Sequence, residues 1–375
     1  MSFGLVWLVE DDRRTPLPAG WEPLRGHRGD ETWFWRKMTK RRVVSDDDMP
    51  GVERGSLTMG VYDDTRWKGS LTWSGLAVDM PSWRDILVQP VHSVELGDGK
   101  RVEWEMGVYL CHTPSMSHEG DGCVTTEVSL HDLTLTLRRA KLLKDSGVFG
   151  GTQVVPHVRS LINFHGGGLL TTAIEDSAST LPSTLTWDAG TSILTIINEL
   201  LATIGYEGLY ADMQGVLRSA PYVAPGDRPI VWSFREADDS VEMSPRDLER
   251  DDFDTANRVS LLTNGEGDEP GLRAVATLDD LAPGHPLSQD VSGQYVDRVE
   301  TVEASSQATL QAMAERMLLE GVTTHSTLRV EHAPVPIGPH SRVSTDLIDS
   351  GTVQNMSIDC ESGAHWTTTL REVIA

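Results

Sequence analysis

Two pairs of acidic residues have the composition that glycoside hydrolysis uses. Glycosidases place one carboxyl group as a proton donor and a second as a base or nucleophile across the sugar bond. Glu103 and Glu105 lie two apart in a strand-like run, so both point to one face about 7 Å apart, while Asp251 and Asp252 are adjacent. However, Glu103 and Glu105 alternate with apolar residues, as acids do in any half-buried strand. We therefore expect both to have a structural role.

Cysteine and histidine also come together in one stretch. Cys111, His112, His118 and Cys123 carry the atom types that bind zinc, but their spacing matches no common zinc module. Three cysteines in a chain of 375 residues do not indicate a disulfide framework. We expect ordinary thiols, with no metal and no cofactor.

The strong catalytic motifs are missing from the sequence. It contains no glycine-rich phosphate loop, zinc-protease motif, nucleophile elbow or dinucleotide-binding fingerprint. Gly166–Gly168 follows His165 as in some oxyanion holes, but no nucleophile accompanies it, so a turn is predicted. We expect that the chain is not an enzyme.

Charge is the most informative feature of the composition. The chain has 56 acidic and 32 basic residues, a net charge of −24. The part from Pro221 onwards holds 27 acidic and 11 basic residues, and the run 236–254 alone holds nine acids. Such a chain repels nucleic acid instead of gripping it. No apolar stretch reaches the eighteen or so residues that a membrane-spanning helix needs, and a signal peptide is not expected at the start.

Tryptophans are concentrated in the first part of the chain, where eight of the eleven lie within 104 residues. Aromatic rings bind carbohydrate in some proteins, but they more often pin a β core or a contact between subunits. We favour contacts between chains. The candidates are Trp33, Trp35, Trp67, Trp73 and Trp83.

The elements that would position these residues are mainly strands. Residues 1–32 are rich in Pro, Gly and Arg and suggest an irregular N-terminal arm. Residues 33–145 contain runs with polar and apolar residues at period two, which predict a β domain. The segment 226–375 has the same character and carries one helix, predicted over 306–320. Together with the helical segment between them, this order predicts an α+β, mainly β fold.

The segment 146–225 contains an internal near-repeat. Residues 151–166 and 190–205 match at a constant offset of 39, and each predicts an amphipathic helix that ends at a glycine. Thr152 and Thr191 are the predicted N-cap residues. We expect two similar helices that cover a small sheet in an α/β insert domain.

Several segments, in order, resemble the minor tail or tail-hub proteins of siphophages, particularly those that infect actinobacteria. They are GVERGSLTMGVYDDTRWKGSLTWSG, VEWEMGVYLCHTPSMSHEGDGCVTTEVSLHDLTLTLRRAKL, WDAGTSILTIINELLATIGYEGLYADMQGVLRSAPY, NRVSLL and SSQATLQAMAERMLLEGV. The resemblance covers about residues 50–375, and its strength lies in the order of individually weak motifs.

This resemblance implies a structural hub at the tail tip (the baseplate hub). Two tail-tube-like β-barrels, 33–145 and 226–375, would be joined by the insert 146–225, and helix 306–320 would cover the second. Three copies would form a homotrimer that joins a sixfold tail tube to a threefold tip and encloses part of the channel for DNA ejection. The implied partners are the distal tail protein, the tape measure protein and other minor tail proteins. DNA would pass without sequence-specific binding, and contact with the host envelope would be indirect.

Within this hub, we expect acidic residues to line the channel, since an acidic wall does not hold a polyanion. The candidates are Glu236, Asp238, Asp239, Glu242, Asp251, Asp252 and Asp254. The protein would be part of the virion, at the tail tip, after assembly in the host cytoplasm. Two rival functions stay open: a cell-wall hydrolase at the tail tip, and a receptor- or glycan-binding tail protein with an exposed tryptophan platform.

Overall fold

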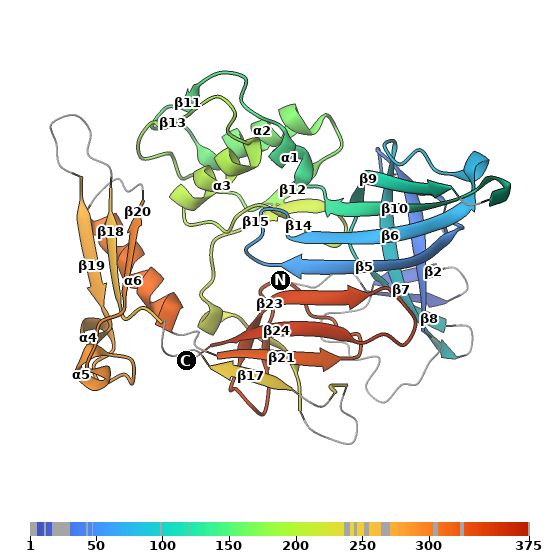
Figure 1. The fold of residues 1–375 in the computed structure, drawn as a ribbon. Coiled ribbons are helices and arrows are strands. Elements are labelled where there is room, and N and C mark those ends of the chain that lie inside the picture. Colours follow the sequence, from blue (N-terminus) through green and yellow to red (C-terminus); the bar gives the residue numbers. More distant parts are fainter. Residues whose placement is uncertain are drawn as a thin grey trace.

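The computed structural model describes residues 6–10, 13–16, 31–42, 44–46, 48–97, 100–118, 120–235, 241–243, 246–250, 255–263, 271–302, 307–322 and 326–373. The main feature is one sixteen-stranded sheet, which is antiparallel except for the pair β16–β22. Its longest path runs β17-β21-β24-β23-β5-β6-β10-β9-β7-β8-β1-β2. The mainly β fold predicted from the sequence is confirmed (Figure 1).

The strands of this sheet come from both ends of the chain. Those from the first part are β1 (Val6–Glu10), β2 (Arg13–Pro16), β3 (Glu31–Thr39), β4 (Val44–Asp46), β5 (Val52–Gly60), β6 (Trp67–Leu76), β7 (Ile86–Gly97), β8 (Lys100–Glu105), β9 (Tyr109–His118) and β10 (Cys123–Asp132). Those from the last part are β16 (Ile230–Ser233), β17 (Asp247–Arg250), β21 (Ser326–His332), β22 (Arg342–Ser344), β23 (Gly351–Asp359) and β24 (Trp366–Glu372). The two sets meet where β5 pairs with β23, with Leu57 opposite Ile358.

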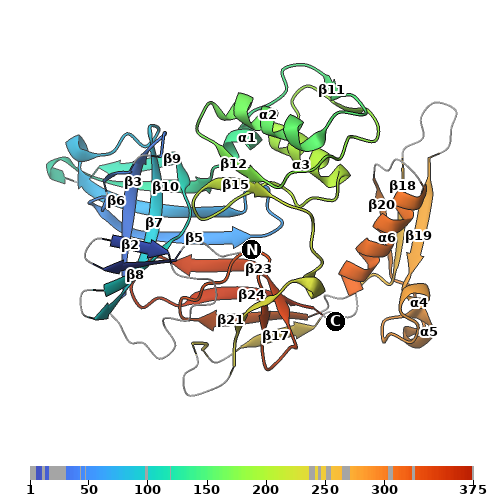
Figure 2. The ribbon, with the colours of Figure 1, turned by 180° about the vertical axis from the view of Figure 1, so that it is seen from behind.

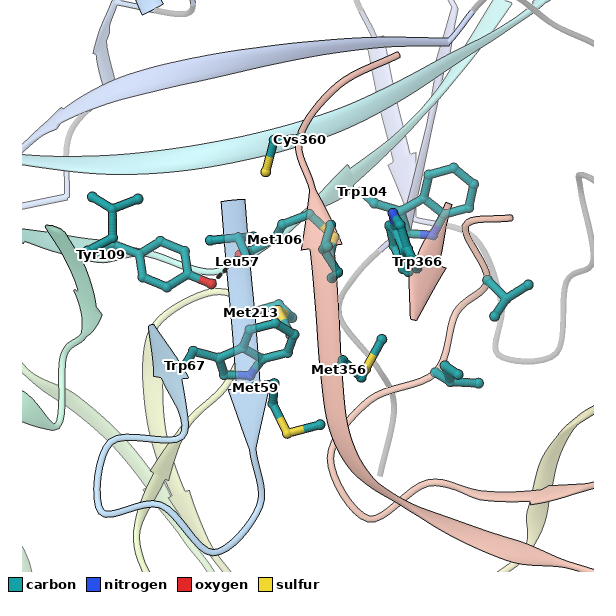
Figure 3. Packing of buried hydrophobic residues seen from close by; sticks show 14 of the residues in the cluster. Leu57, Met59, Trp67, Trp104, Met106, Tyr109, Met213, Met356, Cys360 and Trp366 are labelled. Atoms are coloured by element: carbon teal, nitrogen blue, oxygen red, sulfur yellow. Dashed lines mark hydrogen bonds between the residues drawn. The ribbon is translucent and has the colours of Figure 1, made fainter. Parts of the chain in front are cut away.

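A shared core stabilises this junction. It combines apolar residues of the two sets in one cluster, including Leu57 and Met59 of β5 with Met356 of β23 and Trp366 of β24 (Figure 3). The Tyr109 hydroxyl in the same cluster donates to the Met106 carbonyl at 2.7 Å. Strand β10 shows why these segments form strands, because its buried and exposed residues alternate along its length.

The described residues of the N-terminal arm form strands. Strands β1 and β2 pair with each other, and β1 pairs with β8, so that Leu8 lies opposite Val102. The prediction of an irregular arm was wrong for these residues. The short run Val6–Val9 has high β propensity. The many Pro, Gly and Arg residues around it hide this run in the overall composition of residues 1–32.

The insert contains the two similar helices predicted from the repeat, α2 (Val154–Gly166) and α3 (Ile193–Thr203). Their apolar faces pack with the short helix α1 (Leu135–Arg139) in one cluster. The insert strands are β11 (Ser146–Val148), β12 (Thr171–Ile174), β13 (Leu185–Trp187), β14 (Tyr210–Ala211) and β15 (Val216–Ser219). Strands β12, β15 and β14 form one sheet, and β11 pairs with β13.

The helix predicted at 306–320 exists as α6 (Gln307–Val322), but it covers a different sheet from the one expected. Leu310, Ala314 and Leu318 of α6 pack against a three-stranded sheet that stands apart from the main sheet in both views (Figures 1 and 2). The other elements here are β18 (Arg258–Leu262), β19 (Arg273–Thr277), β20 (Asp297–Thr301), α4 (Leu278–Leu281) and α5 (Gln289–Ser292). Among the helices that the structure describes, none is both long and apolar enough to cross a membrane.

Candidate functional site

The candidate functional site is one face of eight adjacent strands, which we call the polar face. These strands follow the order β17-β21-β24-β23-β5-β6-β10-β9 and lie in one layer in both views (Figures 1 and 2). Their inward residues, such as Leu57, Leu71 and Leu370, belong to the shared core. Most of the opposite side chains are exposed or half-buried.

Small hydroxyl side chains dominate the polar face. They are Ser56, Thr58, Ser70, Ser74, Ser115, Ser117, Thr125, Ser129, Thr327, Ser357, Thr367 and Thr369. Strand register aligns them, because residues directly opposite in antiparallel strands share a face. One row runs through Ser129, Ser70 and Ser56 to Asp359, across β10, β6, β5 and β23. The hydroxyls of Ser56 and Ser70 are 3.0 Å apart.

The charges on the polar face are mixed, and several are paired. Arg54 lies 3.6 Å from Glu127, and Lys68 lies 2.6 Å from Asp63 at the turn that joins β5 to β6. Two shallow hollows, of about 510 and 390 Å³, are lined mainly by hydroxyl, glycine and charged residues of these strands. Such a surface offers hydrogen-bonding groups along all of its strands. It has no concentrated positive charge among the described residues that would bind the phosphate backbone of a nucleic acid.

Both ends of the eight-strand layer have strand edges that are open over most of their length. Strand β9 pairs with β7 only near Leu110, so from Cys111 to His118 its sole strand partner in the described part of the chain is β10. Strand β17 pairs only with β21 among the described strands. An open edge presents backbone N–H and C=O groups that another strand can pair with.

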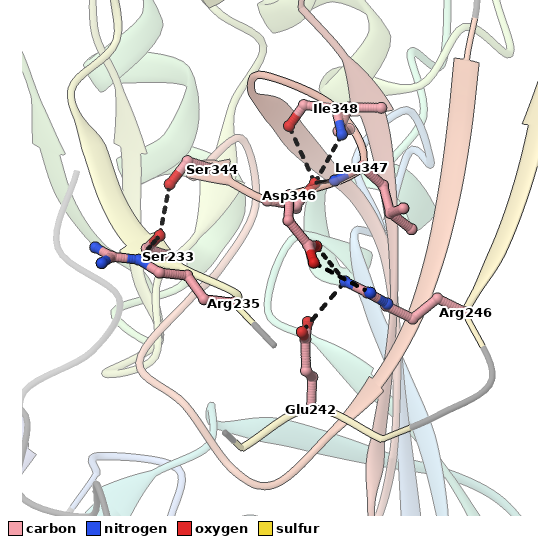
Figure 4. Close-up of polar contacts among 9 residues, drawn as sticks. Ser233, Arg235, Glu242, Arg246, Ser344, Asp346, Leu347 and Ile348 are labelled. Atoms are coloured by element: carbon pink, nitrogen blue, oxygen red, sulfur yellow. Dashed lines mark hydrogen bonds and ion pairs between the residues drawn. The ribbon is translucent and has the colours of Figure 1, made fainter. Parts of the chain in front are cut away.

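Of the seven acids proposed for the channel wall, Glu242 alone lies within the described residues. Its carboxylate accepts from Arg246 Nη1 at 3.2 Å, and Arg246 also pairs with Asp346 (Figure 4). The Glu242 side chain is only 5% exposed, so Arg246 offsets its charge within the chain. The other six, Glu236, Asp238, Asp239, Asp251, Asp252 and Asp254, lie outside the described residues.

The tryptophans proposed as subunit contacts lie largely inside the chain. Trp35, Trp67, Trp73 and Trp83 are between 2% and 5% exposed and belong to the shared core. Trp73 Nε1 donates to the Pro50 carbonyl at 2.8 Å. Their rings offer little surface to a neighbour in this conformation. Trp33 is half-buried and packs at the margin of the same core, so it retains accessible surface.

Glu103 and Glu105, the possible catalytic pair, both bind one buried cation. Arg36 Nη2 donates to Glu103 at 2.8 Å, and Arg36 Nη1 donates to Glu105 at 3.1 Å. Arg101 donates to the second Glu103 oxygen at 2.8 Å. Both acids do lie on one face, as predicted, but Glu103 is completely buried. The carboxylates therefore neutralise Arg36.

The surroundings of Cys111 do not activate its thiol. Burial raises the pKa of Cys111 to about 12, so its thiol stays protonated at neutral pH. No group of three or more His, Cys, Asp or Glu side chains within the described ranges could hold a metal ion. Gly167 and Gly168 adopt positive φ values of 56° and 80°, which fits the predicted turn after α2.

Sequence reasoning missed the polar face. Its signal was visible in the runs GSLT, TTEVSL and HWTTTL, which place a polar residue, mostly Ser or Thr, at every second position. Periodicity could identify these residues as outward-facing. It could not show that β23 pairs with β5, because that pairing joins residues about 300 positions apart, and this junction makes the polar face continuous.

No protein-family model matches the sequence, and no curated protein matches it. Solved structures do match in fold. The tail protein from Neisseria meningitidis MC58 is 14% identical, with a TM-score of 0.64, over 91% of this chain and 97% of that one. The 43 kDa tail protein of prophage MuSo2 from Shewanella oneidensis is 9% identical, with a TM-score of 0.60, over 98% of both chains.

The prophage tail protein gp18 from Listeria monocytogenes EGD-e is a third match, at 8% identity and a TM-score of 0.56, over 90% of this chain and 94% of that one. The three alignments extend over nearly the whole length of each chain. At these identities the likeness concerns the fold, which is that of phage tail proteins. The resemblance identified in the sequence is therefore confirmed at this level.

Proposed function

We propose that this chain is a structural hub at the distal end of a bacteriophage tail, where three copies surround an axial channel for DNA. One observation carries the proposal: an eight-strand layer that continues across both halves of the chain, with the core on one side and the polar face on the other. The fold shared with phage tail proteins supports the same role.

Each chain contributes two barrel-like units in this proposal. The first lies within 33–145 and the second within 226–375, and their sheets join through β5 and β23. Three chains then supply six units, which match a sixfold tail tube, while the insert 146–225 follows threefold symmetry. The hub thereby joins the sixfold tube to the threefold tip.

The open edges of β9 and β17 are where neighbouring chains meet. If β9 of one copy pairs with β17 of the next, three eight-strand layers close into a ring, and no edge remains exposed. Twenty-four strands at about 4.8 Å spacing give a perimeter of roughly 115 Å before strand tilt, or about 37 Å across. A channel of this width admits a DNA duplex.

The polar face lines this channel and lets DNA slide. Its hydroxyl groups and paired charges make no strong contact with phosphates. The acids of the run 236–254 other than Glu242 line the channel and add repulsion. The partners are the distal tail protein, the tape measure protein and other minor tail proteins, at the tip of the assembled virion. Trp33 has accessible surface for contacts between chains.

Cysteine cross-linking between the two open edges tests the proposal. The double variant Ser115→Cys, Glu249→Cys would be made after Cys111 and Cys123 are replaced by Ser, and oxidised within assembled particles. We expect covalent species of two and three chains and none larger, because a ring of three closes. The matched control is Ser115→Cys alone, which should stay uncross-linked. Species longer than three chains, or dimers only, would contradict the threefold ring.

A further inference from the structure

A cavity of about 570 Å³ lies where the insert meets the main sheet. Its wall comes from β12, β14 and β15 of the insert, from the start of β6 and from the loop before β22. Most of the wall is apolar. The apolar contributors are Trp67, Ala173, Ile174, Ala211, Met213, Ala220 and Pro339.

Arg66 lines this cavity, and no described residue forms an ion pair with its guanidinium. The residue is 9% exposed, and its side chain makes no hydrogen bond or ion pair with the described part of the chain. Nη1 is fully buried without an acceptor, and the guanidinium lies over the Tyr210 ring at 4.6 Å. A buried guanidinium without a hydrogen-bond acceptor destabilises the fold unless a bound group supplies that acceptor.

None of the nearby acids forms an ion pair with Arg66 in the described part of the chain, although Glu175 lines the same cavity. Glu207 pairs with Arg228 at 3.2 Å instead of with Arg66. Asp212 accepts from the backbone N–H groups of Gln214 and Val216 and from Arg218 Nε at 2.5 Å. Burial lowers the pKa of Arg66, and the carboxylate of Glu207 partly opposes this effect. Arg66 therefore has no carboxylate bound to it among the described residues.

Gln214 provides a second donor at the same cavity. Its Nε2 is buried and has no partner among the described residues. Its backbone is fixed, because the carbonyl accepts from Arg42 Nη1 at 3.2 Å and the N–H donates to Asp212 at 2.9 Å. Arg66 and Gln214 thus line one largely apolar cavity and each carries an unsatisfied donor, which suits a group with two acceptor oxygens and a single negative charge.

We propose that this cavity binds an organic carboxylate with an apolar body. The carboxylate oxygens accept from Arg66 and Gln214, and the body lies against Ile174, Met213 and Pro339. A phosphate fits less well, since its second charge would stay uncompensated beside Glu175 and Asp212. The assignment does not depend on the role of the chain in a tail.

The test uses the full chain and two probes of the same shape, phenylacetate and the uncharged phenylacetamide, with inorganic phosphate as a third. Isothermal titration calorimetry would measure each. We expect saturable binding of phenylacetate, at least about tenfold tighter than either other probe, because only it supplies a singly charged carboxylate with an apolar body. Equal affinity for the two ring compounds, tighter binding of phosphate, or no saturable binding of phenylacetate would overturn the proposal.

Variants localise the binding. Arg66→Gln should weaken phenylacetate at least about tenfold, whereas Arg54→Gln, which changes an arginine that is 64% exposed on the polar face, should not alter it. Ala173→Trp fills the cavity from an exposed strand position and leaves Arg66 in place, so it should abolish binding even if Arg66→Gln fails to fold. Unchanged affinity in Ala173→Trp would refute the site.

Discussion

Arg36 of β3 reaches across β7 to Glu103 of β8, with Nη2 2.8 Å from the Glu103 oxygen and side chains that are 1% and 0% exposed. Glu105 and Gln89 accept from the same guanidinium. A buried ion pair costs desolvation of both groups, so its net contribution is small, but removing one partner leaves a buried charge uncompensated.

Arg36→Met should therefore lower the free energy of unfolding by about 3–5 kcal/mol. Urea denaturation would measure the change. Arg101→Gln is the matched control, because Arg101 binds the same Glu103 carboxylate but is 45% exposed, so its loss should cost about 1 kcal/mol or less. Equal effects of the two variants would show that burial does not set the energy of this network.

Gly55 lets the Trp35 ring lie directly on β5. A Cβ atom at Gly55 would be 2.2 Å from Trp35 Cζ2 and 2.8 Å from Cη2, so Gly55→Ala forces the ring or the strand to move. We expect a loss of about 1–3 kcal/mol in unfolding free energy. Gly226→Ala is the control, since a Cβ atom there meets nothing within 4 Å. A neutral Gly55→Ala would contradict the close packing.

Two buried histidines should make the protein sensitive to acid. Burial lowers the pKa of His332 to about 4 and that of His340 to about 3, from an ordinary value of 6.5. Both stay neutral in the folded chain while the unfolded chain takes up protons below about pH 6.5. Their contribution to stability is therefore present above pH 6.5 and is lost as the pH falls towards 4 and then 3.

The slope of this loss identifies the responsible group. Each histidine contributes up to about 1.4 kcal/mol per pH unit in this window. His332→Gln should reduce the slope of unfolding free energy against pH, measured by urea denaturation between pH 6.5 and 4. His118→Gln, at an exposed position, should leave the slope unchanged. An unaltered slope in His332→Gln would exclude it as a source of acid sensitivity.

The purified chain should release no soluble fragments from bacterial cell walls. Glycoside hydrolysis needs two carboxyl groups at the sugar bond, and the strongest candidates, Glu103 and Glu105, are bound to Arg36. Turnover that disappears in Glu103→Gln, with folding retained, would establish the rival function of a cell-wall hydrolase. Activity that survives this change would have to come from another source.

Local patterns in the sequence predicted the local structure. The near-repeat predicted α2 and α3, because each has an apolar face with helical spacing, and Gly205 has the positive φ of 70° expected at a helix end. The caps were one residue off. Ser192, not Thr191, accepts from the Thr195 N–H at 3.0 Å, since the helix begins one residue later than the threonine suggested.

Long-range pairing lay beyond the sequence. Leu57 of β5 lies opposite β23, and α6 packs on a separate small sheet. Both arrangements depend on which apolar surfaces meet in the folded chain, and a local sequence pattern does not contain that information. Likewise, the composition of the first 104 residues marked the tryptophans as exceptional but could not say whether Trp67 faces its own core or a neighbour. The sequence around Arg66 indicated a turn but did not indicate that this arginine lines a cavity.

An electron cryomicroscopy map of the assembled tail tip is the most direct test of the hub. Three copies of this chain should surround the axis, each with two related barrel-like units, and Ser56, Ser70 and Ser129 of the polar face should line the channel. Channel-lining charge should be acidic or balanced. A ring of two, four or six copies, a polar face turned away from the axis, or a channel lined mainly by Arg and Lys would contradict the proposed function.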